Sequence, residues 1–237
     1  MLKPHFVRDY NRLVRHVVAV EPDYEVAMAR AVGGGPYTEI GARQRRVLES
    51  LGLQGTHYVI DIGAGSGRLA TALRDLPTLR YLGTDVVSEL LEFAHKKCGR
   101  EDWAFKQVDT IEIPEEDGVA DFVVFFSVLT HLTEKEGYCY LQEAKRVLGK
   151  NGIIIISYLD PDIARHARMA ATCWTQRRWW TQRCRRIIGR GHLNQLLSKK
   201  VLNNWAKELN LSIEYVDEAA HIGQSVCAYR LARLPSA

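Results

Sequence analysis

The spacing of hydrophobic and polar positions changes in a regular way between residues 38 and 160. Short apolar or β-branched runs, which are typical of buried strands, alternate with longer segments whose apolar residues recur at helical spacing. The runs predict strands at residues 58–62, 79–84, 104–108, 121–126 and 153–158. Because parallel strands need long crossover connections, this alternation predicts a parallel sheet built from βαβ units.

The longer segments between these runs predict helices. One helix is expected to begin at about Arg68, and a second carries Leu90, Leu91, Phe93 and Ala94 at helical spacing. A third is expected from about Glu134 to Leu148, where Gly149 and the pair Asn151–Gly152 predict a stop and a turn before the fifth strand.

Two parts of the chain fall outside this alternation. Residues 1–50 read as helices with Val14, Val17 and Val18 on one face, and the segment Gly33–Pro36 interrupts them, so we expect a helical cap with a flexible joint. Residues 161–200 break the strand–helix order, which resumes with a helix at 201–209 and strands near 212–216 and 225–231.

The composition is that of an ordinary globular protein, with 46% hydrophobic and 25% charged residues and a net charge of +4. It excludes collagen, long disorder and a disulfide-stapled miniprotein. No apolar run approaches the ~20 residues of a membrane span, and charges near the N-terminus disfavour a secretory signal, so we expect a cytoplasmic protein. The five cysteines are widely spaced and form no Cys/His cluster, which predicts reduced packing thiols and no metal site.

A glycine-rich turn follows the first predicted strand, in the order Asp61-Ile62-Gly63-Ala64-Gly65-Ser66-Gly67. Glycines at a strand-to-helix turn allow positive φ angles and let a ligand touch the backbone. The turn departs from the GxGxxG dinucleotide pattern because Arg68 stands at the sixth position, and the missing Gly-Lys-Ser/Thr excludes a P-loop.

Aspartates end each of the first three predicted strands, at Asp61, Asp85 and Asp109. Asp61 would repel a pyrophosphate but attract a cationic ligand. Asp85 is placed to accept hydrogen bonds from both hydroxyls of a ribose, and Asp109 from an adenine amino group, with the N–H of Thr110 close by. An aspartate at a strand end also serves as a helix cap or turn former, but three at consecutive strand ends favour a ligand site.

These residues resemble the motifs of the class I S-adenosylmethionine-dependent methyltransferases. Residues 61–69 are similar to the first motif of that family, residues 83–85 to its ribose-binding position and residues 107–109 to its adenine-binding position. Residues 127–132 and 141–152 resemble its fourth strand and following helix, although Lys150-Asn151 replaces the family's Pro-Gly in the turn.

The resemblance implies an α/β fold, a Rossmann-like seven-stranded sheet that is mostly parallel with the last strand antiparallel, helices on both faces and the helical N-terminal cap. It implies S-adenosylmethionine as cofactor, S-adenosylhomocysteine as product and no metal. The expected cofactor-binding residues are Asp61, Gly63, Ala64, Gly65, Gly67, Asp85, Val86, Asp109, Thr110 and Ser127. We expect one domain over residues 1–237, made of the cap (1–50), a cofactor-binding core (51–160), a basic insertion on the substrate side (161–200) and a C-terminal helix with strands (201–237).

Methyl transfer is an in-line displacement, so the protein must mainly align the acceptor and exclude water. A base is needed only for an acceptor of high pKa, such as a sugar hydroxyl. His131, just beyond the fourth strand, is the first candidate for this base, although the sequence favours a histidine that only packs or hydrogen-bonds in the loop. Weaker candidates are Tyr158, Asp160, His192 and His221.

The stretch from 165 to 200 contains ten Lys or Arg residues, no Asp or Glu, and three tryptophans, which leaves the rest of the chain at −6. Arginine forks bind phosphate or carboxylate, and tryptophan stacks on sugars, bases or cations. Three alternatives stay open for this stretch. It is a solvated helical face that packs on the cap or on a second subunit, a basic helix that contacts a membrane surface, or an extended basic surface that binds RNA. The substrate-binding candidates are Tyr37, Tyr158, Arg177, Arg178, Trp179 and His192.

The leading functional prediction is O-methylation of a small or glycan-type acceptor, such as a hydroxyl on an anionic substrate or on a lipid-linked or nucleotide-linked sugar. Residues 127–130 lack the Asn/Asp-Pro-Pro-Tyr/Phe tetrapeptide of amino-methylating nucleic-acid enzymes, which disfavours nucleic acid. Residues 37–44 and 192–206 also resemble bacterial methyltransferases of glycan synthesis, less specifically. The alternatives are an RNA methyltransferase, a non-catalytic protein that docks to a membrane or complex, and, third, a dehydrogenase; an oligomer stays open.

Overall fold

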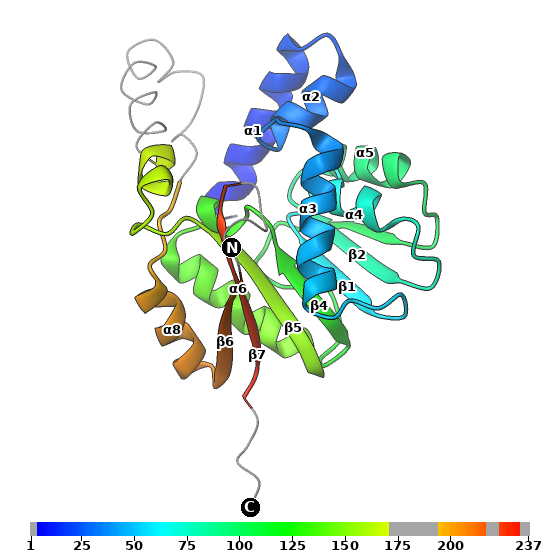
Figure 1. The fold of residues 1–237 in the computed structure, drawn as a ribbon. Helices are drawn as coiled ribbons and strands as arrows, with labels where there is room; N and C mark the ends of the chain where they lie inside the picture. The colour runs from blue at the N-terminus through cyan, green and yellow to red at the C-terminus, as the bar shows by residue number, and fades with distance from the viewer. Residues whose placement is uncertain (1–3, 171–193, 217–222, 233–237) are drawn as a thin grey trace, which may run out of the picture.

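The computed structural model describes residues 4–170, 194–216 and 223–232, and it contains one seven-stranded sheet (Figure 1). The strands lie in the order β3-β2-β1-β4-β5-β7-β6. Their bounds are β1 Tyr58–Ile62, β2 Arg80–Asp85, β3 Ala104–Gln107, β4 Ala120–Phe125, β5 Leu148–Tyr158, β6 Leu211–Val216 and β7 Ser225–Leu231. Strands β1 to β5 pair in parallel, whereas β7 runs antiparallel to both β5 and β6. The predicted Rossmann-like sheet with an antiparallel last strand is confirmed.

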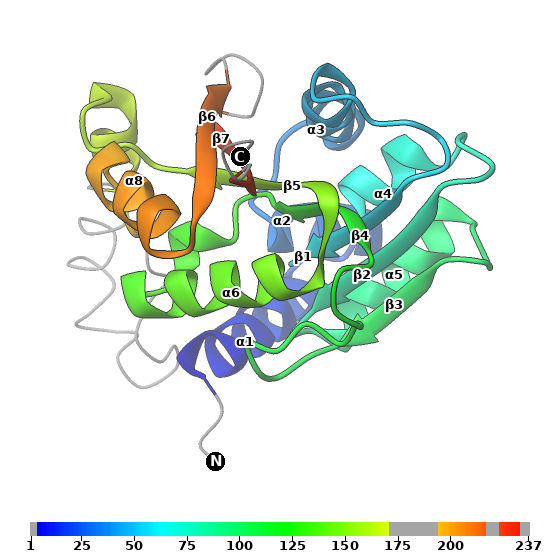
Figure 2. The ribbon, with the colours of Figure 1, turned by 90° about the horizontal axis from the view of Figure 1, so that it is seen from below.

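Helices cover the sheet on both sides (Figure 2). The helices are α1 His5–Val20, α2 Tyr24–Ala31, α3 Tyr37–Ser50, α4 Arg68–Leu73, α5 Ser88–Cys98, α6 Glu134–Val147 and α8 Lys199–Glu208, with a 3-10 turn η1 at Leu129–His131. Helix α4 contacts both α3 and α5, while α6 and α8 pack on the opposite face. No described helix has the length and hydrophobicity needed to cross a membrane.

The central strands are buried on both faces, which explains their continuous apolar sequence. Along β1, Val59 packs into the layer under α3 and α4, and the next residue, Ile60, packs into the layer that contains α6. Both side chains are fully buried. Because successive strand residues point to opposite faces, a strand covered on both sides has no position left for a polar side chain except at its ends.

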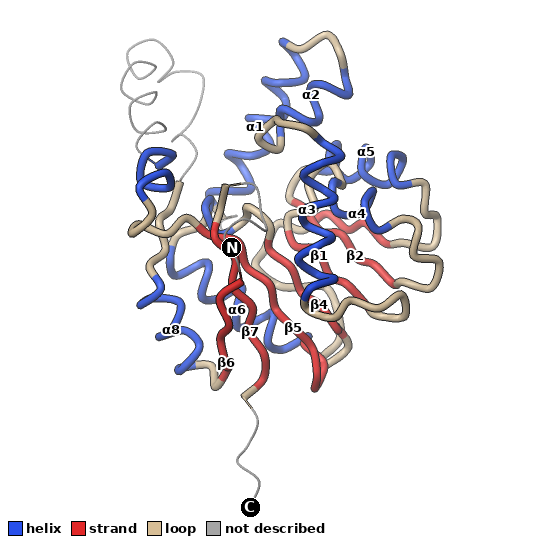
Figure 3. Tube along the Cα trace, viewed as in Figure 1, coloured by secondary structure: helices blue, strands red, loops and turns tan. Residues whose placement is uncertain are grey.

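The N-terminal cap contains three helices, and α1 and α2 lie together beyond the carboxyl ends of the strands (Figure 3). The sequence predicted the break at Gly33–Pro36 but not the earlier one, where the carboxylate of Asp23 accepts from the N–H of Val26 and caps α2. The apolar face that the sequence predicted for α1 is only partly buried. Val14 is buried, but Val18 is 37% exposed because α1 packs along a narrower stripe.

The predicted turn at 149–152 is wrong. Strand β5 already begins at Leu148, which pairs with Ala120 of β4, and the register shifts before Phe122 pairs with Ile153. A Cβ atom on Gly152 would lie 2.7 Å from the carbonyl oxygen of Ala120. Glycine is therefore used here for close approach of two strands.

Candidate functional site

A cavity of about 770 Å³ lies at the carboxyl ends of β1, β2 and β4. Its walls come from α1, the glycine segment 33–35, α3, the turn after β1, the end of β2 and the segment that follows β4. Polar backbone at the ends of parallel strands, covered by helices, is the usual place for a ligand in this type of sheet. Seven of the ten predicted cofactor-binding residues line it, namely Asp61, Gly63, Ala64, Gly65, Asp85, Val86 and Ser127.

The three glycines of the turn after β1 all have positive φ angles, of 69° at Gly63, 55° at Gly65 and 81° at Gly67. A Cβ on Gly63 would lie 2.6 Å from a methyl carbon of Val128, and one on Gly67 equally close to the Cβ of Ala94. Gly63 and Gly65 face the cavity, whereas Gly67 stands behind it at the start of α4. At Gly67 the missing side chain allows close packing of α4 on α5, and the predicted contact with the cofactor stays a prediction.

Asp61 is buried at the end of β1, and its Oδ2 accepts a 2.6 Å hydrogen bond from the hydroxyl of Tyr81. The pKa of Asp61 is raised to about 7, chiefly by burial; the hydrogen bond from Tyr81 opposes the rise, and the charge of Asp85 adds to it. A cation in the cavity would lower this pKa and hold the carboxylate charged. Asp61 is therefore placed to favour a positively charged ligand.

Asp85 organises the glycine turn. Its Oδ2 accepts from the N–H of Gly65 at 2.9 Å, and its Oδ1 accepts from the N–H of Val87 at 3.0 Å. Burial raises the pKa of Asp85 to about 6, and the hydrogen bonds from the backbone oppose the rise. Because each carboxylate oxygen has a second lone pair, Asp85 can still accept from a ligand hydroxyl.

Three buried side-chain oxygen atoms beside the cavity have no hydrogen-bond partner within the described part of the chain. They are Oε1 of Gln44, Oγ of Ser66 and Oγ1 of Thr84, and all three residues line the cavity. Buried polar atoms in proteins are nearly always paired, with protein, water or ligand. These atoms therefore fit a cavity that holds a polar molecule.

Ser127 adopts an unusual backbone conformation, with a φ of 61°, at the point where the chain leaves β4. Its N–H donates a 2.7 Å hydrogen bond to Oγ of Ser157, which donates in turn to Oε1 of Gln224 at 2.7 Å. Ser157 is fully buried, and Gln224 also lines the cavity. The sequence signalled neither Ser157 nor Gln224, since neither belongs to a motif.

His131 lines the cavity at the end of η1. Its ring meets the ring of Tyr10 from α1 edge to face, with 5.3 Å between centroids, and Tyr10 lines the same cavity. The predicted base candidate thus lies on the cavity wall, against Tyr10 of α1. Tyr10 was not predicted, because its helix is remote in sequence from every recognised motif.

Arg68 holds the cap to the core. Its buried guanidinium donates to the carbonyl oxygens of Ala29, Val32 and Gly34, which belong to the end of α2 and the glycine segment. Burial lowers the pKa of Arg68. A cation at the C-terminal end of a helix also interacts favourably with the helix dipole. The residue that departs from the dinucleotide pattern therefore has a structural role in the cap.

Several predicted residues lie elsewhere. Asp109 lines a neighbouring cavity with Val108, and the carbonyl oxygen of Thr110 accepts from the hydroxyl of Tyr140 at 3.2 Å. The hydroxyl of Tyr37 donates to the carbonyl oxygen of Ser66 behind the glycine turn, so Tyr37 supports the turn. Tyr158 is 1% exposed within the core and does not line the main cavity.

Asp160 is also buried, and its Oδ1 accepts from the N–H of Asp162 at 3.0 Å in a turn before the helical residues 164–170. The carboxylate of Asp160 is therefore used in the turn that precedes these helical residues. The predicted residues Arg177, Arg178, Trp179, His192 and His221 lie outside the described residues. Among the described residues, no group of three or more His, Cys, Asp or Glu could hold a metal ion.

The part of the chain that contains strands β1 to β5 is similar in sequence to known proteins. The family model described as a methyltransferase domain matches residues 60–156. A malonyl-[acyl-carrier protein] O-methyltransferase from Geobacter sulfurreducens is 31% identical over 130 residues, which cover 51% of this chain and 48% of the relative. The matched region thus spans about half the length of that curated relative.

Solved structures share the fold at lower identity. A SAM-dependent methyltransferase from Aquifex aeolicus superposes with a TM-score of 0.60 at 16% identity, covering 87% of this chain and 98% of the other. The complex of DhpI with SAH gives a TM-score of 0.62 at 14% identity, covering 94% and 97%. These likenesses show the fold.

Proposed function

We propose that this chain, whose residues 60–156 form a methyltransferase domain of the class I type, transfers the methyl group of S-adenosylmethionine to an acceptor. One observation carries the proposal. Asp61 and Asp85, both buried, face a single cavity beside a glycine turn that leaves its backbone open to a ligand. Two carboxylates in one cavity suit a cationic ligand and repel a pyrophosphate, so they favour this cofactor over a dinucleotide.

The residues present fit that cofactor. Asp61 is placed to attract its positively charged end, Asp85 to accept from the ribose hydroxyls, and the turn at Gly63 and Gly65 to lie against its methionine part. The unpaired buried oxygens of Ser66 and Thr84 offer further polar contacts. When bound, the cofactor supplies a methyl group on a positively charged sulfur, which is the electrophile of the reaction.

The chain itself must align the acceptor and keep water out. Helix α1 and the glycine segment 33–35 cover the cavity, and Arg68 holds that segment against the core. His131 on the cavity wall is the residue we assign to take the proton of a hydroxyl acceptor. A general base of this kind contributes ~10²–10⁴-fold to rate.

We further propose an anionic or sugar-containing acceptor that is methylated on oxygen. Arg30 and Arg43, which pair with Glu21 and Glu39, line the cavity together with His131, so its rim carries cationic side chains that an anionic acceptor would meet. The curated relative is named as an O-methyltransferase of a malonyl group on a carrier protein. Contact of residues 165–200 with a membrane surface stays a prediction.

Isothermal titration calorimetry with S-adenosylmethionine, S-adenosylhomocysteine and NADH tests the cofactor. We expect the first two to bind and Asp85→Asn to weaken binding by at least ~10-fold, while the exposed Asp102→Asn, which pairs only with Arg100, leaves it unchanged. No binding by either ligand up to millimolar concentration would refute the proposal, and tighter binding of NADH would favour a dehydrogenase.

Transfer of a labelled methyl group into a metabolite extract, followed by mass identification of the product, tests catalysis and identifies the acceptor. A protein that binds the cofactor but labels nothing across small-molecule, glycan and RNA extracts would instead be a non-catalytic binding protein. Incorporation of the label into RNA would show that the chain is an RNA methyltransferase.

A further inference from the structure

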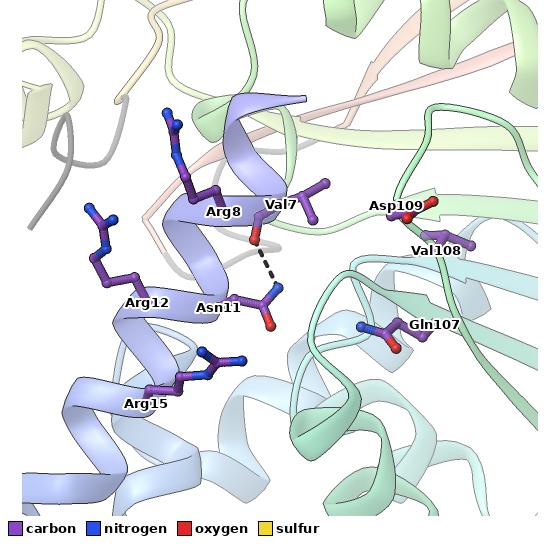
Figure 4. A pocket seen from close by; sticks show the side chains of 8 residues that line it. All are labelled: Val7, Arg8, Asn11, Arg12, Arg15, Gln107, Val108 and Asp109. Carbon is purple, nitrogen blue, oxygen red and sulfur yellow. Dashed lines mark hydrogen bonds between the residues drawn. The ribbon is translucent and has the colours of Figure 1, made fainter. Parts of the chain in front are cut away.

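A second cavity, of about 590 Å³, lies beside the first and is lined mainly by charged and amide side chains. One wall is α1, with Arg8, Arg12 and Arg15, and the opposite wall is the chain at the end of β3, with Gln107 and Asp109 (Figure 4). Arg15 extends toward Gln107, whereas Arg8 and Arg12 extend away from it along the outer side of α1. The proposed chemistry of methyl transfer uses none of these arginines.

The spacing of the three arginines places them on one face of α1, because positions i, i+4 and i+7 of a helix form a single stripe. Phe6, Tyr10 and Leu13 repeat the same spacing on the other side of the helix and line the first cavity. Helix α1 therefore separates the two cavities with an apolar face and a cationic face. Val108 lines both cavities, so they are neighbours at this residue.

The arginines have little compensating negative charge. The structure gives Arg12 and Arg15 no ion pair with any residue in the described ranges, and Arg8 reaches only Asp9, at 3.8 Å, with a side chain that is 67% exposed. Asp109 is the carboxylate on the opposite wall, where it repels an anion and so favours binding of negative charge on the α1 side.

We propose that this arginine face is a binding site for the phosphate or diphosphate group of the acceptor. Guanidinium groups bind phosphate oxygens in pairs of hydrogen bonds, and residues one turn apart lie ~5–6 Å from each other, so two arginines can share a diphosphate. Because Val108 lines both cavities, a phosphate held on α1 would lie beside the cavity that we assign to the reaction. This assignment of the substrate class rests on the proposed methyl transfer, but the anion site itself does not.

The test is calorimetric titration of inorganic pyrophosphate and, separately, inorganic phosphate into the full chain saturated with S-adenosylhomocysteine. We expect saturable binding of pyrophosphate in low salt. The triple variant Arg8→Gln, Arg12→Gln, Arg15→Gln should weaken it by at least ~10-fold. A matched triple variant of exposed cations elsewhere, Arg46→Gln, Arg74→Gln, Lys150→Gln, should bind as the wild type does, because it removes the same charge from other surfaces.

Equal weakening in both triple variants would show a general charge effect and overturn the site, as would the absence of saturable binding up to 10 mM. Sedimentation with vesicles of phosphatidylglycerol and phosphatidylcholine, mixed at about 1:3, distinguishes the source of the phosphate. Binding to vesicles that needs the three arginines, without binding of pyrophosphate, would overturn the proposal in favour of a lipid surface.

The same samples separate this proposal from the proposed function. Both triple variants change only exposed side chains, and thermal unfolding checks that they fold. If S-adenosylhomocysteine binds but pyrophosphate does not, the arginine site fails and methyl transfer stands. If pyrophosphate binds through the arginines but neither cofactor form binds, the anion site stands and methyl transfer fails.

Discussion

The hydroxyl of Tyr81 donates a 2.6 Å hydrogen bond to the carboxylate of Asp61, and both groups are buried. The two residues lie on the adjacent strands β2 and β1. The bond stabilises the charged form of a carboxylate whose pKa burial raises to about 7. Tyr81 thus helps to keep Asp61 ionised near neutral pH, and it does so from a position that does not line the cavity.

Replacing this tyrosine should weaken cofactor binding in a pH-dependent way. In Tyr81→Phe the pKa of Asp61 rises further, so a larger fraction of the carboxyl is protonated at pH 7 and attracts a cationic ligand less. We expect S-adenosylhomocysteine to bind ~5–10-fold more weakly at pH 7 and almost normally at pH 9, as measured by calorimetry. A loss of affinity that is the same at both pH values would show that Tyr81 acts only through packing.

Asp61 should also make the cofactor-free protein less stable at alkaline pH. The pKa of Asp61 is 3.8 in the reference state and about 7 in the fold, so the folded state binds the proton more tightly between these values. Stability from this group is therefore lost as the pH rises from about 4 to about 7, and the full penalty is present above pH 7.

Asp61→Asn removes this penalty because an amide does not ionise, and it can still accept from Tyr81. We expect the variant to be more stable than the wild type at pH 8, by on the order of 2–4 kcal/mol, with the difference shrinking toward pH 5. Urea unfolding at both pH values measures it. A variant less stable than the wild type at pH 8 would contradict the raised pKa.

Replacing Arg68 should weaken the packing of α2 and the glycine segment 33–35 against the core. Arg68→Met removes the guanidinium donor from the carbonyl oxygens of Ala29, Val32 and Gly34, so we expect a loss of ~2–4 kcal/mol and faster hydrogen exchange over residues 29–36. Cofactor affinity should fall with it. Arg43→Met is the control, since Arg43 also lines the cavity but pairs only with Glu39. Equal exchange in both variants would refute the role of Arg68.

Ser157 should matter more than Gln224 for the conformation at Ser127. Ser157→Ala leaves the half-buried N–H of Ser127 without this partner, which costs ~1–3 kcal/mol, whereas Gln224→Ala leaves that hydrogen bond intact. We expect the first variant to lose ~10-fold in cofactor affinity and the second to lose less. Chemical unfolding and calorimetry measure the two effects, and the reverse order would show that Gln224 acts by direct contact with the ligand.

His131→Ala should lower turnover by at least ~100-fold with a hydroxyl acceptor and leave cofactor affinity unchanged. The physical reason is the loss of the group that takes the acceptor's proton. His16→Ala, an exposed histidine on α1, serves as the control. Steady-state kinetics with the identified acceptor provides the measurement. Near-normal turnover in the variant would leave His131 with the packing role that its contact with Tyr10 also allows.

The sequence by itself determined most of the strands and the position of the main cavity. Strands covered on both faces need continuous apolar runs, and these runs are local in the sequence. Asp61 and Asp85 stand at the ends of adjacent strands, and parallel strands bring their carboxyl ends to one edge, so their proximity followed from order alone. The antiparallel last strand came from the family resemblance, since no local pattern sets strand direction.

Only the tertiary structure decided which side chains complete the site. Gln224 meets Ser157 across 67 positions, and Arg68 reaches Gly34 across 34, through contacts that no spacing encodes. The same packing moved Asp109 to the neighbouring cavity and Tyr37 behind the glycine turn. The physical reason is that a local pattern fixes which face of an element is buried, whereas the position of one element against another depends on the packing of every side chain between them.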